Sequence, residues 1–223
     1  MGTQIELSGA DGFHAGAYRA EPDGPPRGGV VVIQEIFGVN AHIREVADGF
    51  ASAGYLAVAP ALFDRLERGV ELGYDAAGME VGIDLARGKL NITDAMTDLA
   101  AAIDVASEAG KVGVVGYCYG GLLTWLAACR LDGVAAASSY YGGGVPGHAK
   151  LRPKCPVILH FGALDAHIPL EDVETFAAAH PESAVHVYDA DHGFNCNHRA
   201  SFDAPSSEQA LERTLAHFRT FIG

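Results

Sequence analysis

The sequence predicts one α/β domain over residues 1–223, with a mostly parallel central sheet and helices on both of its faces. Short runs of β-branched or apolar residues recur without alternation, as in strands buried on both sides of a parallel sheet; they lie at 29–33, 56–59, 112–115, 134–137, 157–160 and 184–188. Segments with helical periodicity alternate with these runs, at 41–53, 92–109, 120–129, 170–179 and 206–221. In such folds ligands bind beyond the carboxyl ends of the strands, so functional residues are expected directly after each strand.

Length, charge and cysteine content narrow the class of protein. A chain of 223 residues fits one domain, preceded here by a hairpin-like N-terminal region and a turn-rich stretch at 21–29. The formal net charge of −13 argues against a nucleic-acid backbone or an anionic membrane as partner. No apolar stretch approaches the roughly 20 residues of a membrane span, and the first residues carry no secretory signal. Four scattered cysteines without a C-x-x-C pair fit reduced thiols, so we expect a cytoplasmic protein, monomeric by default.

The strongest local motif is Gly116-Tyr117-Cys118-Tyr119-Gly120, which lies between a predicted strand and a predicted helix. It is the G-x-S-x-G nucleophile-elbow pattern with cysteine in place of serine. Glycine at the flanking positions leaves room for the sharp strand-to-helix turn. The sulfur would lie over the helix N-terminus, whose free N–H groups favour a thiolate. A glycine-rich loop with an inert cysteine is the alternative, but the flanking strand and helix favour a nucleophile.

Two further polar residues follow predicted strands in an informative order. Asp165 comes after the strand at 157–160, and His192 comes after the strand at 184–188. Taken alone, Asp165 is a turn or capping residue and His192 a surface histidine. In the order nucleophile, acid, base, however, the three match the chain order of an α/β-hydrolase triad. His192 would transfer protons to and from Cys118 and the leaving group, while Asp165 fixes the imidazole tautomer.

The loop after the strand at 29–33 reads Gln34-Glu35-Ile36-Phe37-Gly38 and should border the same site. Backbone N–H groups of Ile36 and Tyr119 are the expected oxyanion hole. Glu35 has two interpretations of similar weight. It could form a local ion pair with Arg44, or it could hydrogen-bond the Cys118 thiol and modulate its ionisation.

With these motifs in place, the sequence resembles the dienelactone hydrolase family of α/β-hydrolases. The resemblance covers most of the chain, and the cysteine elbow together with the Glu35 loop is specific to this family within its superfamily. The matching residues are Gln34 to Gly38, Gly54-Tyr55 with Ala59-Pro60, Gly116 to Gly121, Tyr140 to Gly142, Asp165 with Pro169, and His192 to Phe194.

The resemblance implies hydrolysis of a dienelactone-type enol lactone by a thiolate, with Glu35 holding Cys118 in a resting state until substrate displaces it. Such enzymes bind a substrate carboxylate with two arginines, one before the elbow and one four residues after the catalytic histidine. That position is Cys196 here, and Arg199 lies three residues further on, while Arg87 is the nearest match before the elbow. Either these arginines reach the site from shifted positions, or the natural substrate lacks the carboxylate. Tyr74 and Tyr141 are further pocket candidates, with simple packing as the alternative.

Other functions fit the sequence less well. A metal site built from Asp191, His192, Cys196 and His198 matches no common zinc spacing and leaves the elbow unexplained. We therefore expect no metal, no cofactor, and a small lactone or ester as the only partner. A general carboxylesterase or thioesterase is one alternative. The other is a non-catalytic, ligand-binding member of the fold, although a binding protein has no need for all three triad residues.

Overall fold

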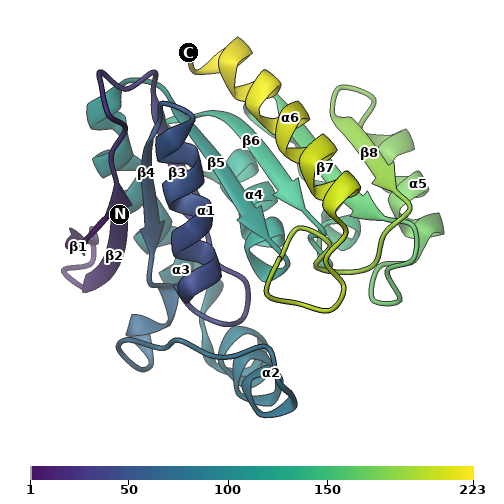
Figure 1. The fold of residues 1–223 in the computed structure, drawn as a ribbon, viewed down its shortest axis with the longest axis horizontal. Helices are drawn as coiled ribbons and strands as arrows, with labels where there is room; N and C mark the ends of the chain where they lie inside the picture. Colours follow the sequence, from purple (N-terminus) through teal and green to yellow (C-terminus); the bar gives the residue numbers. More distant parts are fainter. Residues whose placement is uncertain (1) are drawn as a thin grey trace.

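The protein is described by a computed structural model that covers residues 2–223, and its centre is one eight-stranded sheet (Figure 1). The strand order is β1-β2-β4-β3-β5-β6-β7-β8, and every pair from β4 to β8 is parallel. The antiparallel strands β1 and β2 form the expected N-terminal hairpin and extend the sheet beside β4. The strands are β1 (Thr3–Ser8), β2 (His14–Ala20), β3 (Gly29–Ile33), β4 (Leu56–Pro60), β5 (Val112–Tyr117), β6 (Val134–Tyr140), β7 (Val157–Gly162) and β8 (Ala184–Tyr188).

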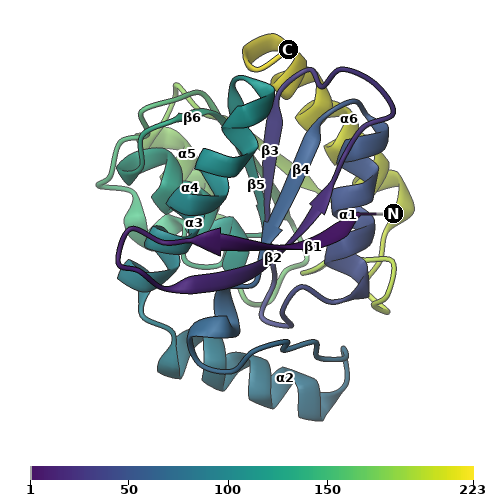
Figure 2. The same cartoon turned by 90° about the vertical axis from the view of Figure 1, so that its left-hand side faces the viewer.

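Helices cover both faces of the sheet, as the alternating pattern predicts. Figure 2 shows α1 and α6 on one face and α3, α4 and α5 on the other. β3, β4, β5 and β7 are buried along their whole lengths, which explains why their sequences show no alternation. The five helices are α1 (Ala41–Ser52), α3 (Ile92–Ala106), α4 (Tyr119–Arg130), α5 (Leu170–Ala179) and α6 (Ala204–Phe221). Within residues 2–223, none of the helices has the length and apolar character that crossing a bilayer requires.

One helical segment lies beyond the carboxyl ends of the strands and was not predicted (Figure 1). It consists of α2 (Ala76–Ile83) and a π-helical turn over Asp84–Lys89. The side chain of Asp75 caps α2 by accepting a hydrogen bond of 2.7 Å from the Gly78 N–H. At Gly82 the helix backbone meets the carbonyl oxygen of Ile36 so closely that a Cβ atom would not fit. The segment thereby becomes a wall beside the loop that follows β3.

Candidate active site

Cys118 occupies the turn between β5 and α4 with φ 55° and ψ −113°, a conformation that only a tightly determined backbone maintains in a non-glycine residue. The next turn of α4 lies directly against the end of β3. A Cβ atom on Gly120 would come within 2.5 Å of the carbonyl oxygens of Ile33 and Gln34. Glycine therefore allows the helix N-terminus, and the Cys118 sulfur above it, to approach the Glu35–Ile36 loop.

His192 and Asp165 lie together beyond the ends of β8 and β7. The Nδ1 atom of His192 is 2.7 Å from Oδ2 of Asp165, and the His167 N–H donates to Oδ1 at 2.8 Å. The Asp165 side chain is fully buried and that of His192 is 11% exposed. The ring of Tyr141 packs edge-on against the imidazole, with ring centroids 5.1 Å apart. Both oxygens of the Asp165 carboxylate are thus engaged, which fixes the orientation of the His192 imidazole. Its Nε2 atom remains available for chemistry.

The charge state of His192 follows from competing effects. Burial lowers the pKa of the imidazole, but interactions with Asp165 and with Cys118 outweigh burial and raise that pKa to about 10. These interactions favour the protonated form of the imidazole. A protonated imidazole at this position can deliver a proton to a departing oxygen.

The two expected oxyanion donors border the same cleft as the sulfur. Ile36 and Tyr119 line it together with Cys118 and His192. Tyr119 is the first residue of α4, so its N–H has no partner within the helix. Across residues 2–223 the backbone N–H of Ile36 likewise donates no hydrogen bond to another protein group. Two free N–H groups next to a nucleophile suit an oxygen that gains negative charge.

Glu35 is completely buried beside this site, and neither sequence interpretation describes its contacts. The proposed ion pair with Arg44 is wrong, because Arg44 pairs with Glu71 at 2.8 Å on the surface. Instead the Tyr74 hydroxyl donates to Oε2 of Glu35 at 2.9 Å, and Nη1 of Arg199 lies 3.5 Å from Oε1. Burial and the charge of Glu35 together raise the pKa of Tyr74 well above its usual range. A hydrogen bond to the Cys118 thiol is not among the contacts of Glu35 in the described chain.

The cleft above Cys118 has a volume of about 530 Å³. Of the four pocket candidates, Arg87 and Arg199 line it, whereas Tyr74 and Tyr141 do not. The hydroxyl of Tyr74 is committed to Glu35, and Tyr141 is fully buried beneath His192. Sequence reasoning missed the apolar lining of the cleft, which comes largely from α2 and the segment after it: Met79, Ile83, Ala86, Leu90 and Ile92, joined by Leu122 of α4.

Comparison with known proteins agrees with this architecture. The model of the dienelactone hydrolase family matches residues 15–222. A Pseudomonas putida protein named carboxymethylenebutenolidase is 34% identical over 222 residues, which cover 95% of this chain and 93% of its own. A Synechocystis protein is 36% identical over 211 residues, 86% of this chain and 85% of its own. The crystal structure of a Klebsiella pneumoniae protein superposes with a TM-score of 0.84 at 30% identity and covers 99% of this chain and 100% of the other. The chain belongs to the dienelactone hydrolase family and is an ester hydrolase with the α/β-hydrolase fold.

Proposed function

We propose that the protein hydrolyses small lactones or esters through an acyl-enzyme on Cys118. The thiolate attacks the carbonyl carbon, and the Ile36 and Tyr119 N–H groups stabilise the resulting oxyanion. Collapse of this intermediate breaks the carbon–oxygen bond, and His192 gives its proton to the departing oxygen. His192 then removes a proton from water, which attacks the thioester and releases the acid and the thiolate. With a lactone the departing oxygen stays tethered to the acyl group, so the whole substrate remains bound until the second step.

The observation that carries this proposal is the position of Cys118, in a strained elbow at the floor of the cleft, beside an imidazole that Asp165 orients. Strained backbone of this kind clusters at functional sites, and here it presents the sulfur to the cleft. A non-catalytic binding protein would not require a protonated imidazole at the same place.

The walls of the cleft favour a small, partly apolar substrate that carries a negative charge. Ile36, Met79 and Leu122 supply apolar surface, while Arg87 supplies a positive charge beside Arg199, whose own charge faces Glu35. The Pseudomonas putida relative is named for a carboxylate-bearing enol lactone, a molecule with these properties. We therefore propose a dienelactone-type enol lactone as the substrate class, ahead of simple acyl esters and thioesters.

The test compares kcat/KM for an enol lactone with a carboxylate and for a neutral nitrophenyl ester, in wild type and in Cys118→Ala. We expect the lactone to be preferred, and Cys118→Ala to lose about 10³-fold or more with both substrates. Cys129→Ala is the matched control, because Cys129 lies at the end of α4 away from the cleft and should leave kcat/KM unchanged. Activity that survives in Cys118→Ala refutes the mechanism, and a preference for the neutral ester refutes the substrate class.

A further inference from the structure

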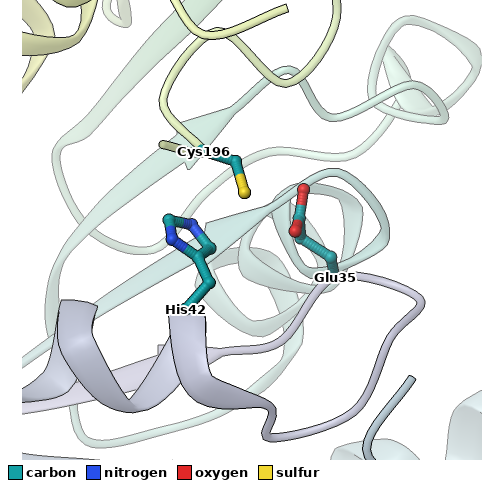
Figure 3. Close-up of side chains that lie close together, drawn as sticks. All are labelled: Glu35, His42 and Cys196. Carbon is teal, nitrogen blue, oxygen red and sulfur yellow. The ribbon is translucent and has the colours of Figure 1, made fainter. Parts of the chain in front are cut away.

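Behind the active site, two buried side chains from neighbouring positions after β3 meet a third from the C-terminal part of the chain (Figure 3). They are Glu35 from the loop after β3, His42 from the first turn of α1, and Cys196 from the loop that also carries His192. One ligand atom from each lies within 4.8 Å of the other two. Glu35 and Cys196 are fully buried and His42 is 3% exposed, so all three side chains lie away from bulk solvent.

Two polar atoms of this cluster have no hydrogen-bond partner within residues 2–223. They are Oε1 of Glu35 and Nε2 of His42, both buried. A buried polar atom without a partner costs free energy, so native proteins rarely retain one without a reason. Arg199 approaches Oε1 only to 3.5 Å and from the side of the cleft. Two such atoms in one cluster are suited to a ligand that contacts both of them.

The hydrogen-bonding state of His42 suits a metal ion. Its Nδ1 lies 3.2 Å from Oδ1 of Asn197 and is the donor of that bond, because a carbonyl oxygen can only accept. The lone pair of the ring is then on Nε2, the unpartnered atom. A second residue that fixes the tautomer is typical of metal-binding histidines.

We propose that Glu35, His42 and Cys196 form a binding site for one divalent transition-metal ion of the Zn²⁺ class. Carboxylate, imidazole and thiolate are all zinc ligands, and three of them leave a fourth position for water. Zinc bonds of about 2.0–2.3 Å place tetrahedral ligand atoms roughly 3.5 Å apart, so small side-chain rotations close the cluster. On binding, Cys196 releases its proton to solvent, and the two negative ligands balance the charge of the ion.

The His42 side of the cluster borders a second cavity. This cavity of about 300 Å³ lies between α1 and α6, and its lining includes His42, Glu45 and Asn197. Glu45 and His198 pair at 2.9 Å near its mouth and form a second, more exposed potential ligand group with His42. A bound ion would link the loop that carries the Ile36 oxyanion donor to the loop that carries His192. The site would thereby brace two parts of the catalytic machinery without touching the substrate.

The experiment uses the Cys118→Ala protein, because Cys118 and His192 could themselves bind a metal. Titration with Co²⁺ should produce the near-ultraviolet charge-transfer absorption of a thiolate–cobalt bond, saturating at one equivalent, and should raise the thermal unfolding midpoint. Adding Cys196→Ala should abolish the absorption. Adding His42→Gln removes a ligand and should weaken Co²⁺ binding by more than about 100-fold, since loss of a residue that only hydrogen-bonds a ligand lowers metal affinity about 10–100-fold. The test does not depend on catalysis, so it is independent of the proposed function.

Two matched variants in the same Cys118→Ala background decide where the ion is held. Cys129→Ala removes a thiol outside the cluster, and His198→Gln removes the exposed histidine; both should leave the absorption intact. Circular dichroism of each variant checks that it folds. The proposal is overturned if the absorption persists after Cys196→Ala is added, or if it is lost with His198→Gln or Cys129→Ala. It is also overturned if Cys118→Ala alone shows no absorption at saturating Co²⁺.

Discussion

Nδ1 of His192 and Oδ2 of Asp165 are 2.7 Å apart, and the other oxygen of Asp165 accepts the His167 N–H. One oxygen of this carboxylate therefore binds the His192 imidazole, while the backbone N–H of His167 holds the other and fixes the orientation of the carboxylate. The pair connects β7 to β8 at the carboxyl ends of the strands, where the elbow after β5 also lies.

Asp165→Asn should lower kcat by about 10³–10⁴-fold while the protein remains folded. An amide can accept through its oxygen only, so it cannot both receive the His167 N–H and hold Nδ1–H of His192. The imidazole then populates the wrong tautomer. Steady-state kinetics check this, with Asp191→Asn as control, because Asp191 bonds only to the backbone N–H of His192 at 2.6 Å. Equal losses in the two variants would contradict the assigned role of Asp165.

Stability should depend on pH through the same pair. The pKa of His192 is about 10 in the folded protein, against roughly 6.5 in an unfolded chain. The folded state therefore holds a proton that the unfolded state releases, and this contribution is complete below pH ~6.5 and is lost as pH rises through 10. Urea unfolding between pH 6.5 and 10 should show the stability advantage of wild type over Asp165→Asn shrinking. A constant difference would show that the imidazole is neutral.

The four thiols should differ sharply in reactivity. Burial raises the pKa of Cys129 to about 11, that of Cys155 to about 12 and that of Cys196 to about 11, the last with help from the charge of Glu35. Cys118 instead lines the cleft beside a protonated imidazole. Brief treatment with iodoacetamide at pH 7, followed by peptide mass mapping, should label Cys118 first. Uniform labelling of the native protein would remove the argument for a thiolate.

Two buried tyrosines offer a paired test of hydrogen bonding. The Tyr74 hydroxyl donates to the buried carboxylate of Glu35, whereas the Tyr141 hydroxyl is buried without a partner in the described chain. Tyr74→Phe should lower the free energy of unfolding by about 1.5–3 kcal/mol, as for a bond to a charged group. Tyr141→Phe removes an unsatisfied group and should be neutral or stabilising. Chemical denaturation measures both, and a larger loss in Tyr141→Phe would be inconsistent with these contacts.

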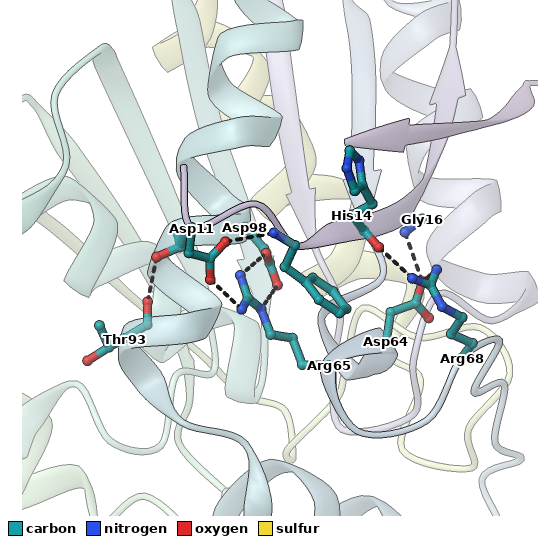
Figure 4. Close-up of polar contacts among 10 residues, drawn as sticks. Asp11, His14, Gly16, Asp64, Arg65, Arg68, Thr93 and Asp98 are labelled. Atoms are coloured by element: carbon teal, nitrogen blue, oxygen red, sulfur yellow. Dashed lines mark hydrogen bonds and ion pairs between the residues drawn. The ribbon is translucent and has the colours of Figure 1, made fainter. Parts of the chain in front are cut away.

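Far from the active site, Arg65 joins the turn of the N-terminal hairpin to α3 (Figure 4). It forms two hydrogen bonds, of 2.9 and 2.7 Å, with Asp98 and one of 2.6 Å with Asp11. The Asp98 side chain is only 1% exposed, so Arg65→Met leaves a buried charge without compensation and should cost about 3–5 kcal/mol. Lys154→Met, which breaks an exposed pair, should leave the denaturation midpoint unchanged. Similar effects of the two substitutions would exclude a structural role for the buried pair.

The sheet and its five covering helices follow from sequence periodicity because burial on both faces leaves a strong local signal. The helix predicted at 120–129 begins at Tyr119, and the strand at 29–33 has the predicted bounds. The elbow was visible because its glycines and cysteine are adjacent in sequence. Asp165 and His192 were visible because each directly follows a strand, which made their order along the chain informative.

The wall of the cleft could not be predicted in this way. α2 contains two glycines and has no clear apolar stripe, because it lies across the strand ends instead of packing on the sheet. The partners of Glu35 were also hidden, since Tyr74 is 39 residues away in sequence and Arg199 lies in the opposite half of the chain. Contacts of this kind depend on tertiary structure and leave no periodic signal.

The close approach of Gly82 to the Ile36 carbonyl limits how this cleft can be reshaped. Any side chain at position 82 would clash with the backbone of Ile36, which carries an expected oxyanion donor. A larger residue there would therefore lower kcat as well as change which substrates fit. Met79 and Ile83 reach into the cleft from the same helix without such contact. Laboratory evolution toward bulkier substrates should therefore accumulate changes at 79 and 83 and preserve glycine at 82.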